Sequence, residues 1–291
     1  MIRARALGLI AAAAALPACA PRSAVSVGSK NFTEQLILGE MYAQILERDG
    51  ITVGRKLDLG GTQIAMAALR KGEIDLYPEY TGTALLTVLH LPAQSDGAAI
   101  YQTVKREYQR QFDLTWLAPA PMNDTQALAT TQAIAQRYDM RTLSKLSTVA
   151  PQLRLGAIPE FTTREDGLPG LQRAYGGFHF KEVRLFDIGL KYKALLTGNV
   201  DVVVAFGTDG QIAADDLVVL EDDRHFWPVY QVAPVVRDET LRAYPKIAPS
   251  LDALAPLLTD ATMRHLNDQV DGRKLEPADV ARAFLRSHNL A

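Results

Sequence analysis

The chain has 291 residues, 48% of them hydrophobic, which is enough apolar material for one or two cores of ordinary size. Its formal net charge is only −2 at pH 7 and it contains no long run of Lys or Arg, so we expect no nucleic acid partner and no attraction to an anionic membrane surface. It has a single cysteine, which excludes an internal disulfide, so packing must stabilise the fold.

The chain begins MIRARALGLIAAAAALPACA, in which Arg3 and Arg5 precede an apolar run. This run is too short to cross a bilayer and has the length of a secretory signal. Cys19 lies in the context LPAC, which resembles the lipobox of bacterial lipoproteins, although Pro17 is untypical of that motif. We therefore predict a signal peptide over residues 1–23 and an exported chain, with acylation of Cys19 as the expectation and plain cleavage as the alternative.

The next segment predicts a strand, a loop and a long helix. The stretch SVGSKNFTEQ predicts a strand, a glycine, a short loop and a helix start, and Asn31 followed three residues later by Glu34 resembles a capping box. Apolar residues then recur at helical spacing until Gly50, which is a typical helix stop.

An internal repeat divides the chain. The stretches ALRKGEIDLYPEYTGT (68–83) and ALLTGNVDVVVAFGTDG (194–210) match without a gap. Both predict a helix that ends at glycine, a strand that opens with a β-branched residue and Asp, and an aromatic residue before a turn. The aromatic residues are Tyr80 and Phe206.

A weaker match precedes each copy, because SVGSKNFTEQ and RLGAIPEFTTRE both predict a strand, a short loop and a helix start. Strand–helix–strand crossovers place successive strands parallel, so the fold class is α/β with two lobes and parallel-rich sheets. Ligands in such folds bind at the carboxyl ends of the strands, which is where Tyr80 and Phe206 are expected.

Two extended segments with an Ala-Pro pair connect the predicted lobes: WLAPAPMND (116–124) and WPVYQVAPVV (227–236). Proline discourages helix, so we expect crossover strands at both places. Lobe 1 then contains residues 24–118 and 232–291, and lobe 2 contains residues 119–231. The C-terminal helical region shows no catalytic cluster and is expected to contribute packing.

Several segments resemble one protein family, namely VGSKNFTEQLILGEMYAQIL, KGEIDLYPEYTGTAL, LAPAPMNDTQALA, FDIGLKYKALLTG and AFGTDGQI. They are similar to the substrate-binding proteins of bacterial ABC importers for quaternary amines of the glycine betaine, choline and carnitine class. The resemblance covers essentially the whole mature chain. It implies a two-lobe periplasmic-binding fold with an interlobe cleft, a permease partner in the cytoplasmic membrane, a periplasmic or extracytoplasmic location, a monomer, and no cofactor or metal.

A quaternary ammonium group has no N–H donor, so aromatic faces recognise it through cation–π attraction. The resemblance places such an aromatic box on Tyr80, Phe206 and Tyr230, and on Gln126, where the family usually has tyrosine. Packing is the alternative role for each ring. We expect Tyr77 and Trp227 to pack, and a further ring of the box is the alternative role for Trp227.

The resemblance also implies contacts to polar ligand atoms. Arg164 matches the position that binds a ligand carboxylate, and a solvated surface charge is the alternative. Thr83 matches a hydrogen-bonding contact, and Asp124 is expected to face the cation. Lys30 and Asn31 are weaker candidates, because polar loop residues commonly cap helices.

Other function classes fit less well. The sequence has no GxSxG, HExxH or paired-cysteine motif, its histidines are scattered, and Asp209 has no nucleophile nearby in sequence, so we predict no enzyme. A ligand-sensing domain of a transcription regulator would need a helix-turn-helix and would lack a signal. A binding protein for carnitine, ergothioneine or a non-ammonium osmolyte remains an open alternative.

Overall fold

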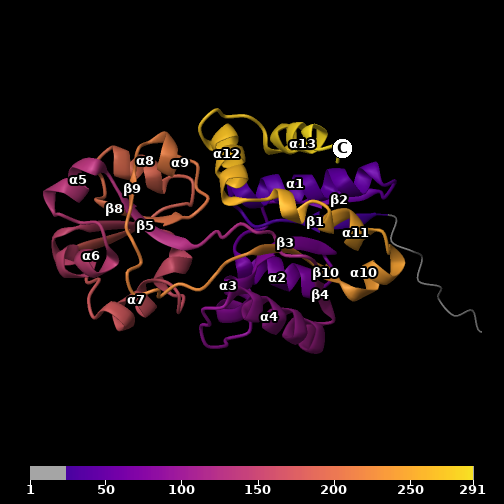
Figure 1. Ribbon diagram of the computed structural model, residues 1–291, viewed down its shortest axis with the longest axis horizontal. Coiled ribbons are helices and arrows are strands. Elements are labelled where there is room, and N and C mark those ends of the chain that lie inside the picture. Colours follow the sequence, from indigo (N-terminus) through magenta and orange to yellow (C-terminus); the bar gives the residue numbers. More distant parts are fainter. Residues whose placement is uncertain (1–23, 291) are drawn as a thin grey trace, which may run out of the picture.

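The structure is a computed structural model that describes residues 24–290, so the predicted signal peptide and Cys19 lie outside the described residues. It has two α/β lobes, each built around a five-stranded sheet (Figure 1). The two-lobe fold class with parallel-rich sheets is therefore confirmed. Across residues 24–290, none of the helices combines the length and the apolar character that crossing a membrane requires.

The sheet of lobe 1 has the strand order β2-β1-β3-β10-β4. Strands β1, β2 and β3 are parallel, whereas β10 runs antiparallel to both β3 and β4. The bounds of these strands are β1 Val25–Gly28, β2 Val53–Lys56, β3 Leu76–Tyr80, β4 Leu114–Trp116 and β10 Val232–Arg237.

The sheet of lobe 2 repeats this arrangement with the order β7-β6-β8-β5-β9. Again three strands, β6, β7 and β8, are parallel, and β5 runs antiparallel to its neighbours β8 and β9. The bounds are β5 Gln126–Thr130, β6 Arg154–Ala157, β7 Glu182–Leu185, β8 Val202–Phe206 and β9 Val218–Val219.

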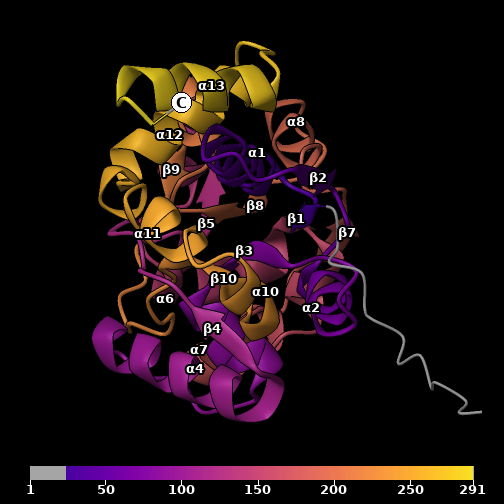
Figure 2. The same cartoon turned by 90° about the vertical axis from the view of Figure 1, so that its right-hand side faces the viewer.

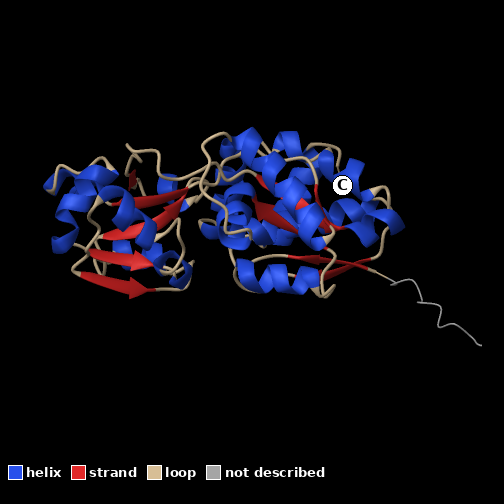
Figure 3. Ribbon diagram, turned by 90° about the horizontal axis from the view of Figure 1, so that it is seen from below, coloured by secondary structure: helices blue, strands red, loops and turns tan. Residues whose placement is uncertain are grey.

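Helices cover both faces of each sheet, as Figure 3 shows with helices and strands in contrasting colours. In lobe 1 the helices are α1 Thr33–Arg48, α2 Thr62–Arg70, α3 Thr81–Thr83, α4 Gly97–Phe112, α10 Asp238–Ala243, α11 Ile247–Asp252, α12 Asp260–Asp271 and α13 Pro277–Ser287. In lobe 2 they are α5 Gln132–Arg137, α6 Leu143–Val149, α7 Leu168–Tyr175, α8 Lys191–Leu196 and α9 Gln211–Ala214. A π-helical turn spans Ala84–Val88, and 3₁₀ turns span Ala150–Gln152, Pro159–Thr162 and Ala255–Leu257.

Helix α1 is the centre of the larger core. Its residues Ile37, Leu38 and Met41 are fully buried, and α12 and α13 lie over it, as Figure 2 shows. This placement gives the C-terminal region the packing role that its apolar periodicity predicts.

The aspartate that recurs in the internal repeat has the same structural role just before β3 and just before β8. Asp75 accepts a hydrogen bond from the backbone N–H of Ser26 at 2.7 Å, and Asp201 accepts one from the backbone N–H of Arg154 at 2.8 Å. Each aspartate therefore ties the start of β3 or β8 to the neighbouring parallel strand. Gly72 and Gly198 precede them at φ of 68° and 70°, a left-handed conformation that favours glycine.

The capping box predicted at the start of α1 is wrong. Phe32 is the N-cap residue and no side chain caps the helix there. Glu34 instead points inward, where the Tyr80 hydroxyl donates to its Oε1 at 2.7 Å, because buried donors are available on that side. The predicted stop is confirmed, since α1 ends before Gly50, which has φ of 81°.

The two connections between the lobes lie side by side. The backbone N–H of Ala120 donates to the carbonyl of Val232 at 2.8 Å, and that of Asp124 donates to the carbonyl of Tyr230 at 3.1 Å. These hydrogen bonds hold the two connecting segments together. The lobe boundaries at 118/119 and 231/232 stay a prediction.

Candidate functional site

A cavity of ≈180 Å³ lies between the lobes at the carboxyl ends of β3 and β8. Its walls come from lobe 1, from both crossovers and from lobe 2. They include all nine residues that the sequence predicts as ligand contacts: Lys30, Asn31, Tyr80, Thr83, Asp124, Gln126, Arg164, Phe206 and Tyr230. The structure thus brings them together, while their role as ligand contacts stays a prediction.

Tyr80, the last residue of β3, lines one side of the cavity. Its ring is stacked on Phe32, with ring centroids 6.2 Å apart, and the Lys30 ammonium lies 5.1 Å from its centroid. Lys30 is itself paired with the buried Glu79 at 2.5 Å. The Tyr80 ring therefore already interacts with one protein cation.

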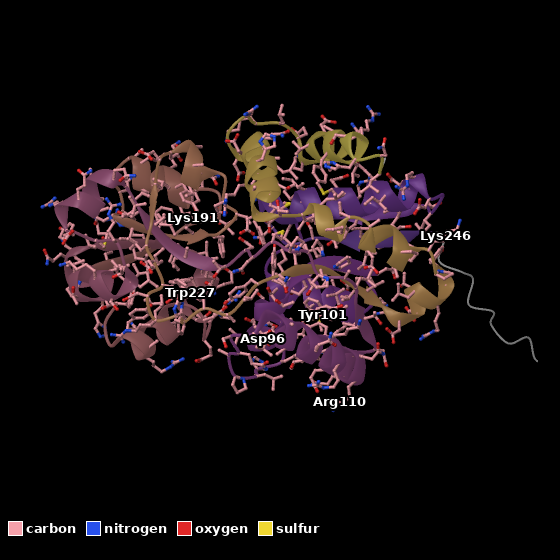
Figure 4. All side chains as sticks on the ribbon, in the orientation of Figure 1. Asp96, Tyr101, Arg110, Lys191, Trp227 and Lys246 are labelled. Carbon is pink, nitrogen blue, oxygen red and sulfur yellow. The ribbon has the colours of Figure 1, made fainter. Side chains whose placement is uncertain are left out.

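Phe206 occupies the equivalent place at the end of β8, opposite Gln126 of β5. The ammonium of Lys191 lies 5.0 Å from its ring centroid and 3.2 Å from the carboxylate of Asp209. Lys191 is buried and belongs to lobe 2, where Figure 4 labels it. Each of the two repeat-related rings thus has a lysine paired with an acid beside it.

Arg164, Gln126 and Tyr230 converge on Asp166. The Arg164 guanidinium forms a two-pronged ion pair with both carboxylate oxygens of Asp166. The Tyr230 hydroxyl donates to Asp166 Oδ2 at 2.6 Å, and Gln126 Nε2 donates to the Asp166 carbonyl at 3.0 Å. The alternative of a fully solvated surface charge is therefore wrong for Arg164, whose side chain is only 20% exposed.

A buried hydroxyl joins two carboxyl groups beside the cavity. Thr208 Oγ1 lies 2.6 Å from Glu34 Oε2 and 2.7 Å from Asp124 Oδ1. One hydroxyl hydrogen can serve only one of these oxygens, so the other carboxyl group must hold a proton and donate it to Thr208.

We assign this proton to Asp124. Burial raises the pKa of Glu34 as well, but the hydrogen bonds that Glu34 accepts from Thr208, from the hydroxyl of Tyr80 and from the amide of Asn267 oppose that rise. Burial, followed by the neighbouring charges of Glu34 and Asp209, raises the pKa of Asp124 well above its usual range. Asp124 therefore faces the cavity as a neutral acid. Its predicted contact with a cation would then rest on the dipole of the carboxyl group and not on a negative charge.

Nine further residues line the cavity and were not predicted, among them Phe32, Thr62, Glu160 and Phe186. Phe186 directly follows β7, which is parallel to β6, so the strand-end rule that selected Tyr80 would also have selected it. Phe32 stands in the Phe-Thr match of the repeat, but its counterpart Phe161 is a core residue, so the repeat gave no consistent signal.

The two aromatic residues that were expected to pack lie outside the cavity walls. Tyr77 is fully buried, and its hydroxyl donates to Glu79 at 2.7 Å. Trp227, labelled in Figure 4, packs against both lobes and donates its indole N–H to the carbonyl of Asp166 at 2.8 Å. Among the described residues, no group of three or more His, Cys, Asp or Glu is arranged to hold a metal ion.

Comparison with known proteins gives a consistent result. The family model described as "Substrate binding domain of ABC-type glycine betaine transport system" matches residues 23–287. A solved structure titled "Crystal structure of glycine betaine/carnitine/choline ABC transporter" is similar with a TM-score of 0.75 and 32% identity, covering 91% of this chain and 99% of that one.

Two curated relatives are each 37% identical to the chain. One is an ergothioneine transport permease/ergothioneine binding protein of Helicobacter pylori (strain G27), matched over 91% of this chain. The chain spans only 48% of that relative's length. The other is a glycine-betaine-binding protein of Pseudomonas aeruginosa, matched over 91% of this chain and 88% of the relative.

Proposed function

The chain belongs to the family of substrate-binding domains of ABC-type glycine betaine transport systems, and we propose that it captures a quaternary ammonium solute in its interlobe cavity for an ABC permease. In this proposal the chain binds its solute for transport and is not an enzyme. Glycine betaine and choline define the proposed ligand class. Carnitine, ergothioneine and a non-ammonium osmolyte remain the alternatives.

One observation supports this proposal above the others. Tyr80 from lobe 1, Phe206 from lobe 2 and Tyr230 from a crossover line the same cavity. A trimethylammonium group has a diffuse charge and no N–H, so several ring faces can hold it where hydrogen bonds cannot. Because the rings come from both lobes, a bound cation would also hold the lobes together.

The polar wall of the cavity suits the other end of such a ligand. Arg164 lines the cavity, but Asp166 occupies two of its donors, so a ligand carboxylate would use the remaining N–H groups of the guanidinium. Thr83 and Asn31 add further hydrogen-bonding groups to the lining of the cavity. Asp166 fixes the orientation of Arg164 in the absence of ligand, which reduces the ordering cost of binding.

Gln126 takes the place of an aromatic residue of the family's box. Its amide donates to the Asp166 carbonyl and to the Tyr230 hydroxyl, the latter at 3.4 Å. It therefore braces one remaining ring of the box without offering a ring of its own. Either glycine betaine binds weakly, or the preferred ligand carries a further polar group.

We extend the proposal to the setting of the protein. An exported chain that is acylated at Cys19 would remain at the outer side of the cytoplasmic membrane, close to its permease. Cleavage without acylation would instead give a freely diffusing periplasmic protein. The ligand contacts described above need one chain only, which supports function as a monomer.

Isothermal titration calorimetry tests the proposed function. The purified protein would be titrated with glycine betaine, choline, carnitine and ergothioneine, with proline as an osmolyte that lacks a quaternary ammonium group. We expect saturable binding of at least one quaternary ammonium compound and much weaker binding of proline. Failure to bind any of the four, or equal binding of proline, would refute the proposal.

A further inference from the structure

A chain of hydrogen bonds places Asp124 between the two repeat-related rings of the cavity. The backbone N–H and the hydroxyl of Thr208 lie 3.4 Å and 2.7 Å from the same oxygen of Asp124, Oδ1. Thr208 stands two residues after Phe206 and also bonds Glu34. Glu34 in turn accepts a hydrogen bond from the hydroxyl of Tyr80. Asp124 therefore lies on a continuous path from the Phe206 end of lobe 2 to the Tyr80 ring of lobe 1.

The other carboxyl oxygen of Asp124 is turned toward the cavity. Oδ2 meets no hydrogen bond within residues 24–290, and it is not sealed off by neighbouring atoms. It is therefore accessible from the cavity that Asp124 lines together with Tyr80 and Phe206. A ligand cation held at these rings has the Asp124 carboxyl group as a direct neighbour.

The state of this carboxyl group depends on the charge beside it. The Thr208 hydroxyl has one hydrogen for two carboxyl oxygens, at 2.6 Å from Glu34 and 2.7 Å from Asp124, so one of the two acids keeps a proton. Ionisation of both would place two negative charges on either side of one buried hydroxyl, which is costly. A cation close to Oδ2 reverses this balance, because it stabilises the ionised form of Asp124.

The protein itself does not supply such a cation. Lys30, Arg164 and Lys191 line the first cavity or the adjoining cavity of ≈270 Å³, of which Asp124 forms a common wall. Each of the three is already paired with an acid of its own.

The acids along both cavities oppose ionisation of Asp124, because their charges have the same sign. They are Glu34, Asp58, Glu160, Asp187, Asp209 and Asp271. Lys30, Tyr80 and Tyr192 are further ionisable groups within electrostatic reach of Asp124. Burial, followed by the charges of Glu34 and Asp209, keeps the pKa of Asp124 well above its usual range. The positive charge that would ionise Asp124 must therefore come with the ligand.

We propose that capture of a quaternary ammonium ligand is coupled to release of the Asp124 proton, so that the protein binds such ligands more tightly as pH rises. The inference rests on the proposed function, because that function places the ligand cation at the rings beside Asp124. The O–H bond of Asp124 breaks, the proton passes to water, and the carboxylate pairs with the cation. The Thr208 hydroxyl keeps its hydrogen bond to Glu34, and the Thr208 backbone N–H continues to donate to Asp124 Oδ1.

The direction of the pH effect follows from linkage. The ligand cation lowers the pKa of Asp124, so between the pKa of the bound state and the higher pKa of the unbound state each binding event releases a proton. In that window the dissociation constant falls by up to about tenfold per pH unit, and outside it the dissociation constant does not change. A site without this proton binds the same ligands with equal affinity at every pH.

Calorimetry in buffers of different ionisation enthalpy counts the protons that binding releases. The probes are glycine betaine, choline, carnitine and ergothioneine. None of them has a group that titrates between pH 5 and pH 9, so a released proton comes from the protein. We expect release of up to one proton per ligand bound, and binding that is about tenfold or more tighter at pH 9 than at pH 5.

A variant at Asp124 tests the residue assignment. Asp124→Asn keeps the shape of the side chain as a neutral group whose amide can donate to Thr208, but it holds no proton that a ligand could release. We expect this variant to release no proton and to bind the ligand equally at pH 5 and pH 9. Asp139→Asn, at an exposed position after α5 and outside the cavity lining, is the matched control and should behave as the unmodified protein.

The outcomes separate the coupling from the proposed function. Binding without proton release, at equal affinity across the pH range, would overturn the coupling and leave the proposed function intact. Proton release that persists in Asp124→Asn would place the proton on another group and would also overturn it. Failure of all four compounds to bind at any pH would overturn the proposed function itself.

Discussion

Tyr80 and Phe206 end equivalent strands of the two lobes, and each has a lysine ammonium beside its ring, 5.1 Å from the centroid in Tyr80 and 5.0 Å in Phe206. A ligand cation at these rings must approach Lys30 and Lys191. The paired acids Glu79 and Asp209 neutralise the two lysines and so reduce the repulsion that the ligand experiences.

Replacement of Tyr80 by leucine should weaken quaternary ammonium binding by about three- to thirtyfold. This range corresponds to a cation–π contribution of about 0.5–2 kcal/mol, while leucine retains much of the apolar volume. Tyr80→Phe is the control, because it keeps the ring and removes only the hydroxyl that donates to Glu34. Calorimetry on both variants measures the difference, and equal affinities would show that the ring does not contact the cation.

Replacement of Arg164 by alanine should affect ligands according to their charge. Glycine betaine should bind about tenfold more weakly, since its carboxylate loses a charge-assisted hydrogen bond. Choline should bind as before or more tightly, because Asp166 is then left without its guanidinium partner. Arg173→Ala, at an arginine of α7 with a 60% exposed side chain, is the control. Equal losses for both ligands would contradict the assignment to the carboxylate.

Replacement of Gln126 by tyrosine distinguishes the two expectations for this position. If the missing ring limits affinity, the variant should bind glycine betaine more tightly, by about the contribution of one cation–π contact. If the true ligand contacts the side-chain amide of Gln126, the variant should bind that ligand more weakly and should still bind glycine betaine weakly. Submicromolar binding of glycine betaine by the unmodified protein, undiminished in Gln126→Ala, would contradict both.

The proton held by Asp124 predicts a pH dependence of stability. Because its pKa is raised in the folded state, the folded protein binds more protons than the unfolded chain above pH ~4, so the free energy of unfolding falls as pH rises through that window. The slope is at most about 1.4 kcal/mol per pH unit for one proton. Asp124→Asn should flatten this dependence, as urea unfolding at pH 5 and pH 8 would reveal. An unchanged slope would place the proton elsewhere.

The ring of Tyr230 explains why a glycine, Gly82, stands in the Thr-Gly-Thr segment. A Cβ atom at this position would lie 2.7 Å from two ring atoms of Tyr230. Gly82→Ala should therefore displace the ring, destabilise the protein by about 1–3 kcal/mol and weaken ligand binding. Gly54→Ala is the control, since its nearest neighbour would lie at 3.7 Å. Unfolding and calorimetry together test the prediction, and wild-type affinity would show that Tyr230 contributes no contact.

The sequence was informative where a local pattern repeats. The match between the segments around Tyr80 and Phe206 predicted both parallel strand sets and the place of the cavity, because strand ends have a fixed relation to ligand sites. Glu34 shows the limit of such reasoning. Its partners Thr208 and Asn267 lie 174 and 233 residues away, so the capping box was the only interpretation that neighbouring residues could support. The protonated state of Asp124 likewise depends on contacts that only the folded chain creates.

The strand order of lobe 1 also bears on how the chain reaches its native state. Strand β3 pairs with β10, and the adjoining Thr81 and Gln231 are 150 residues apart, whereas all five strands of lobe 2 come from one uninterrupted segment. Pairing across such a separation is slow, since a long loop must close first. We therefore expect lobe 2 to form early, while β3 presents an open edge until β10 has paired with it. Pulsed hydrogen exchange during refolding would show this order as protection of β6 and β8 before β3. Until β10 pairs with β3, the open strand edge in the N-terminal half of the chain is the part most exposed to aggregation.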